Sequence, residues 1–96
     1  MIIAVSCEQG EKFSSFVYFR IENGAVHERE EVPVAPGGTP ELIAQLLGLE
    51  VDMLISGKTH PDLTAALMES GIMSIRDVSG RADSVMAAYL KGDLEF

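Results

Sequence analysis

The hydrophobic pattern of this sequence changes its character near residue 35. Before that point, residues 2–7 form a short apolar, β-branched run, and residues 13–21 alternate aromatic and β-branched side chains between two faces, as strands do. The pair Asn23-Gly24 suits a tight hairpin turn because both residues tolerate positive φ. Residues 25–34 then return as an antiparallel strand. The first third of the chain therefore predicts a three-stranded meander.

Beyond this point the apolar residues recur at helical spacing, interrupted by two further apolar runs typical of buried strands. Thr39 is expected to cap the first helix, with Pro40 at its first helical position. The later elements are a strand over 51–56, a helix that Gly71 ends, a strand over 72–78 and a helix over 82–91. The side chains expected in the core of this half are Leu42, Ile43, Leu46, Leu47, Met53, Leu63, Ala66, Leu67, Met68, Met73, Val85, Met86 and Tyr89.

The resulting order of elements is β-β-β-α-β-α-β-α, which is the order of the ribonuclease H fold. A meander makes its first and third strands parallel, and right-handed crossovers bring the last two strands in parallel to the first. Charged residues 27–31 and Pro33 suit an exposed edge strand. We therefore expect an α/β, three-layer, ribonuclease H-like fold with a five-stranded mixed sheet of order 3-2-1-4-5, formed by residues 1–96 as a single domain.

The composition excludes several classes of partner. Lys plus Arg number 7 and Asp plus Glu 15, so the net charge of −8 opposes binding to nucleic acid or to an anionic membrane. Cys7 is the single cysteine, which excludes an internal disulfide and any multi-cysteine metal site built by one chain. No apolar run approaches the ~20 residues needed to span a bilayer. These features predict a soluble, cytoplasmic protein.

Glycine-rich loops follow the strands that point the same way, and open α/β sheets bind their ligands at this carboxyl edge. Glycines allow backbone N–H groups to approach an anion, and Lys58 and Arg81 add positive charge. Cys7 and His60 supply a thiol and an imidazole, which suit iron, zinc or copper, and are the predicted metal ligands. The predicted cofactor-binding residues are Cys7, Gly37, Gly38, Gly57, Lys58, Thr59, His60, Gly80 and Arg81.

Each of these residues also has a purely structural interpretation. Glycines before helices commonly serve as turn residues. Cys7 suits a small buried position, and His60 suits a helix cap because it stands directly before Pro61.

No arrangement of side chains indicates catalysis. The sequence contains no recognisable Ser-His-Asp set, no H-E-x-x-H motif and no cluster of carboxylates. A nuclease of the ribonuclease H fold needs metal-binding carboxylates on its central strands, and residues 2–7 contain none. The sequence therefore predicts a protein that is not an enzyme.

Several segments, in their order and spacing, resemble the dinitrogenase iron–molybdenum cofactor biosynthesis family, which includes NifX, NafY and the C-terminal part of NifB. The resemblance runs over nearly the whole chain, and the matching segments are residues 2–6, 19–24, 37–38, 51–57, 65–72 and 87–94. It implies a ribonuclease H-like fold without nuclease activity, and binding of iron–sulfur or iron–molybdenum cluster precursors. Family members usually carry a His-Phe-Gly segment in a longer first loop, whereas the first loop of this chain is short and lacks histidine. Cys7 and His60 are our candidates to replace that ligand.

The leading hypothesis is non-enzymatic binding or carrying of an iron–sulfur or iron–molybdenum cluster precursor at the carboxyl edge of the sheet, with a protein partner in cofactor assembly. Two alternatives stay open, both without a metallocluster. One is a regulatory or scaffold module that binds a partner protein, which the small size and the charged edge strand favour. The other is a pocket for a small phosphorylated or carboxylate metabolite near residues 57–60.

Overall fold

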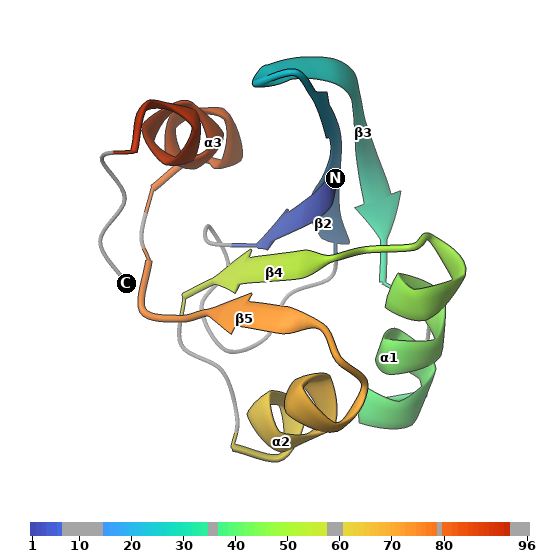
Figure 1. Cartoon of the computed structure of the whole chain (residues 1–96). Helices are drawn as coiled ribbons and strands as arrows, with labels where there is room; N and C mark the ends of the chain where they lie inside the picture. Colours follow the sequence, from blue (N-terminus) through green and yellow to red (C-terminus); the bar gives the residue numbers. More distant parts are fainter. Residues whose placement is uncertain (7–14, 35–36, 58–60, 79, 93–96) are drawn as a thin grey trace.

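The computed structural model describes residues 1–6, 15–34, 37–57, 61–78 and 80–92 (Figure 1). The elements are β1 (Ile2–Ser6), β2 (Ser15–Glu22), β3 (Ala25–Pro33), α1 (Thr39–Gly48), β4 (Met53–Ser56), α2 (Pro61–Glu69), β5 (Met73–Ile75) and α3 (Ala82–Lys91). The strands form one five-stranded sheet in the order β3-β2-β1-β4-β5, which confirms the predicted element order and sheet order. Within the described ranges, no helix has the length and apolarity needed to cross a membrane.

β1 lies at the centre of the sheet and pairs with a neighbour on each side. It runs antiparallel to β2, where Ile3 lies opposite Phe19, and parallel to β4, where Ile3 lies beside Met53. β4 in turn pairs parallel with β5, and the arrows of these two strands point the same way in Figure 1. The carboxyl ends of β1, β4 and β5 therefore lie along one edge of the sheet.

Helices cover both faces of this sheet, α3 on one face and α1 with α2 on the other (Figure 1). Successive residues of β1 contribute to different faces: Ile3 and Val5 join the core under α3, whereas Ala4 joins the core under α1 and α2. Burial on both faces explains why β1 is apolar until its last residue. Side chains that fill the two cores include Phe19, Ile55, Val85 and Met86 under α3, and Phe16, Leu46, Leu54 and Leu67 under α1 and α2.

Three apolar side chains expected in the core are exposed instead. Leu47 is 49% exposed, Met68 74% and Met73 60%. Leu47 and Met68 directly follow Leu46 and Leu67, which are fully buried, and one helical step turns the next side chain by about 100°. Met73 begins β5, which is an end strand of the sheet. The prediction was wrong for these residues because hydrophobicity alone does not define the edge of a helical stripe or of a sheet.

Several element boundaries also differ from the expectation; β4, for example, begins at Met53 rather than at residue 51. α1 begins at Thr39 itself, and its N-cap is Gly38, without any side-chain capping bond. β5 ends at Ile75 rather than at Val78, and Asp77 has a φ of 60°. A non-glycine residue in this left-handed region turns the chain out of the strand.

A charged contact joins α3 to the β2–β3 hairpin. Arg29 Nε donates to Asp83 Oδ1 at 2.7 Å, and Arg29 Nη2 donates to Asp83 Oδ2 at 3.2 Å. The Arg29 guanidinium carbon also lies 6.0 Å from the centroid of the Phe19 ring, at the outer limit of a cation–π contact. The Arg29 hydrogen bond lowers the pKa of the Asp83 carboxyl below its ordinary value. This contact links the start of α3 to a residue in the middle of β3.

Asp83→Asn is expected to remove a pH-dependent part of the stability. A carboxyl whose pKa is lowered in the folded protein stabilises the fold above its unfolded pKa, near 3.8, and loses this effect as the pH falls through the lowered value. Urea unfolding measured from acidic to neutral pH should therefore give wild type a higher free energy of unfolding than the variant at pH values above the unfolded pKa. Below the lowered, folded-state pKa, the two proteins should have equal free energies of unfolding. Glu69→Gln, an exposed carboxyl on α2, is the matched control. Parallel pH profiles for wild type and Asp83→Asn would contradict this expectation.

Candidate functional site

The carboxyl edge of the sheet brings three chain segments together. Ser6 ends β1 and lies in parallel register with Ser56, which ends β4. The segment that follows β5 turns along the same end, where Asp77 N donates to Gly57 O and Val78 N donates to Ser56 O, each at 3.0 Å. Backbone hydrogen bonds therefore fix the exits of β1 and β4 and the segment after β5 side by side, as the prediction of a common edge requires.

Two serine side chains mark this edge. The strand alternation places Ser6 and Ser56 on the face that α1 and α2 cover, and they are 4% and 0% exposed. Ser6 Oγ donates to Ser15 O at 3.3 Å. Ser56 Oγ has no hydrogen-bond partner within the part of the chain that the structure describes. Neither serine is among the predicted site residues, although a serine that ends each of two apolar strands is a signal visible in the sequence.

The described residues of the predicted site fall into two groups, one near the ends of β4 and β5 and the other directly before α1. Gly57 is buried at the end of β4, and Gly80 and Arg81 are exposed directly before α3. These three lie within a few residues of the hydrogen bonds that join residues 56–57 to residues 77–78. The predicted ligands Cys7 and His60, together with Lys58 and Thr59, lie outside the described residues.

Gly37 and Gly38 belong to a different part of the molecule. They directly precede α1, and Figure 1 places the start of α1 across the view from the ends of β4 and β5. The twist of the sheet and the end position of β3 separate this helix start from the other loops. Gly37 has a local role, because at its φ of 125° a Cβ atom would lie 2.6 Å from the Glu41 side chain. The structure therefore does not bring Gly37 and Gly38 to the other predicted residues.

A shallow hollow of about 540 Å³ lies at the opposite, amino edge of the sheet. Its lining includes Ile2, Glu50 and Asp52. One oxygen of Asp52 accepts a hydrogen bond from the Ile2 backbone N–H at 2.8 Å. This bond links the residue before β4 to the first residue of β1. The lining contains two carboxylates and no Lys, Arg or His. Its chemistry thus differs from the anion-binding edge that the sequence predicts.

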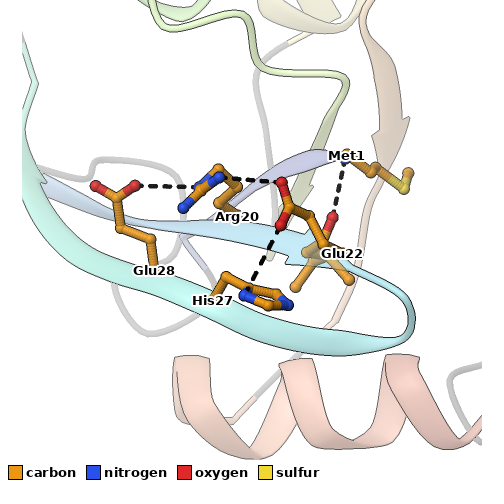
Figure 2. A network of polar contacts seen from close by, with 6 residues as sticks. Met1, Arg20, Glu22, His27 and Glu28 are labelled. Carbon is orange, nitrogen blue, oxygen red and sulfur yellow. Dashed lines mark hydrogen bonds and ion pairs between the residues drawn. The ribbon is translucent and has the colours of Figure 1, made fainter.

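A network of polar contacts between side chains covers the outer surface of the β2–β3 hairpin (Figure 2). Arg20 lies 3.0 Å from a carboxylate oxygen of Glu22 and 3.3 Å from one of Glu28. His27 Nδ1 lies 3.8 Å from the other oxygen of Glu22. All four side chains are between 42% and 49% exposed. The described residues contain no group of three or more His, Cys, Asp or Glu that could hold a metal ion.

Known proteins share the architecture rather than a close sequence. No protein-family model and no curated protein matches the sequence. The crystal structure of PH0822 superposes with a TM-score of 0.86 at 24% identity, over 99% of this chain and 95% of that one. The NMR structure of a NifB-like protein from Thermotoga, of the DUF35 family, superposes with a TM-score of 0.69 at 22% identity, over 98% of this chain and 90% of that one. At these identities, the likeness establishes the fold.

Ser56→Ala is expected to stabilise the protein. A buried hydroxyl without a partner loses its hydrogen bonds to water on folding, so its removal should raise the free energy of unfolding by about 1 kcal/mol. Ser6→Ala is the matched control in the neighbouring strand. It deletes the bond to Ser15 O and should lower the free energy of unfolding by about 0.5–1 kcal/mol. Urea titrations of the two variants measure both effects, and equal destabilisation by both would contradict the assignment of Ser56.

Proposed function

We propose that this protein binds or carries an iron–sulfur or iron–molybdenum cluster precursor at the carboxyl edge of its sheet, without catalysing a reaction. The observation that carries the proposal is the parallel register of β1 and β4, which ends with Ser6 beside Ser56. In the sequence, Cys7 is the next residue after Ser6, and His60 comes shortly after Ser56. The two candidate ligands thus belong to segments that leave the sheet from neighbouring strand ends.

The chemistry of these two residues suits iron. A cysteine thiolate and a neutral imidazole are among the ligands that bind iron and iron–sulfur clusters in proteins. Structural metal sites usually take all their ligands from the protein, whereas a site with two protein ligands leaves coordination positions for other groups. Such a site suits a cluster that the protein binds and then transfers, rather than a cofactor that it retains.

The electrostatics of the edge support an anionic cargo. Arg81 is exposed directly before α3, and Lys58 follows Ser56 and Gly57 in the sequence. These cations stand in a protein whose net charge is −8. A local positive charge at the edge would offset the repulsion that the rest of the surface exerts on an anion.

The shared fold supports the class of cargo. The Thermotoga protein, which covers 98% of this chain in the superposition, is described as NifB-like. The segments that resemble the dinitrogenase cofactor biosynthesis family include residues 2–6 and 51–57, which contain β1 and β4. The proposal thus combines the resemblance with the strand pair that supports the candidate ligands.

Anaerobic reconstitution with iron and sulfide tests this function. Wild type should take up iron and develop charge-transfer absorbance, and Cys7→Ser and His60→Ala should each lose most of both, because each removes one of two ligands. His27→Ala is the control for loss of a histidine, since His27 lies on the outer surface of the hairpin, in ion-pair range of Glu22. Circular dichroism of each variant checks that the fold is intact.

Two outcomes would overturn the proposal. One is a wild type that takes up neither iron nor molybdenum under these conditions. The other is uptake that falls equally in His60→Ala and His27→Ala, which would indicate adventitious binding by surface histidines.

A further inference from the structure

We propose that the outer edge of β3, which pairs with no further strand among the described residues, is a docking surface for a basic, extended segment of a partner protein, which adds to the sheet as a sixth strand. This interaction is independent of the cluster site. It uses the end of the sheet at β3, whereas the proposed cluster site uses the edge formed by the exits of β1 and β4. Strand addition at a sheet edge is a common mode of peptide recognition, in which backbone hydrogen bonds provide affinity and side chains provide selectivity.

The geometry of β3 suits strand addition. It is an end strand of nine residues, and eight of them are exposed. A strand of this length extends about 30 Å, close to the longest dimension of the molecule, 33 Å. At its carboxyl end, Gln45 Nε2 from α1 donates to Pro33 O at 2.8 Å, so a side chain already bonds one backbone carbonyl there. A segment of about seven residues would fit along the rest of the strand.

The charges of β3 select the partner. Glu28 is paired with Arg20, as Figure 2 shows, and Arg29 is paired with Asp83. Glu30 and Glu31 form no ion pair with a cation in the described part of the chain; Glu31 accepts a hydrogen bond from Ser15 Oγ at 3.4 Å. Successive residues of a strand point to opposite faces, so these two carboxylates stand on both sides of the edge. Lys or Arg on an added strand would lie next to them.

In the register centred on Arg29, the same charges oppose antiparallel pairing with a second copy of this chain. Two β3 strands that pair antiparallel about Arg29 would place Glu28 opposite the partner copy's Glu30, and Arg29 opposite its own equivalent. Like charges directly opposite each other on neighbouring strands are destabilising. A segment with Lys or Arg at alternate positions would instead place positive charges next to Glu28 and Glu30, which is favourable. The position of that segment that faces Arg29 must then be uncharged.

A synthetic peptide of seven residues, with Lys at alternate positions between Val and Thr, is the probe. Fluorescence anisotropy should detect binding that weakens as salt rises from about 50 to 150 mM. Hydrogen exchange should slow at the β3 amides in the presence of the peptide. Glu30→Lys should weaken binding about tenfold, the effect expected when two favourable cross-strand charge contacts become repulsive. Glu69→Lys, an exposed site on α2 with the same change in net charge, should leave the affinity within about twofold.

A second probe separates strand addition from simple charge attraction. The same peptide, N-methylated at every residue, keeps its side-chain charges but has no backbone N–H to donate from either edge, so it should not bind. Three outcomes would overturn the proposal: equal weakening by Glu30→Lys and Glu69→Lys, equal binding of the N-methylated peptide, and protection that maps away from β3. Protection of β3 that grows with protein concentration alone would also overturn it, because the occupant would then be a second copy of the chain.

Discussion

The parallel pairing of β1 with β4 joins the two halves of this protein. From Ile3 beside Met53 to Ser6 beside Ser56, it connects the antiparallel meander to the α-β-α-β-α half. Both faces of β1 are buried by this arrangement, so its side chains contribute to the core under α3 and to the core under α1 and α2. The same pairing sets the exits of the two strands side by side. Stability and the geometry of the proposed cluster site thus depend on one set of backbone hydrogen bonds.

The order of the sheet follows from the sequence because few arrangements satisfy its constraints. Asn23-Gly24 forms the hairpin turn, with Asn23 at a φ of 54° and Gly24 at 76°. Gly71, at a φ of 78°, follows α2 as expected of a residue that ends a helix. With the hairpin fixed, right-handed crossovers leave the position beside β1 for β4. The acidic strand at residues 25–33 takes the end position because its charged side chains cannot be buried on two faces.

The details of the site depend on three-dimensional features that a pattern of residue types does not contain. The twist of the sheet moves the loop of Gly37 and Gly38 away from Gly57, although all follow strands that point in one direction. The buried hydroxyl of Ser56 depends on the register between two strands, which hydrophobicity does not define to one residue. The convergence of Cys7 and His60 stays a prediction, since both lie outside the described residues.

The central position of β1 also bears on the order in which the chain acquires its structure. β1 and the β2–β3 hairpin are close in sequence, so their antiparallel contacts require only short loops to close. The bond from the Ile2 backbone N–H to the Asp52 carboxylate joins groups 50 residues apart. During synthesis, one flank and both faces of β1 must therefore wait for β4 and the helices to leave the ribosome. In that interval the nascent meander presents an apolar strand that a chaperone, rather than the rest of the domain, would have to shield.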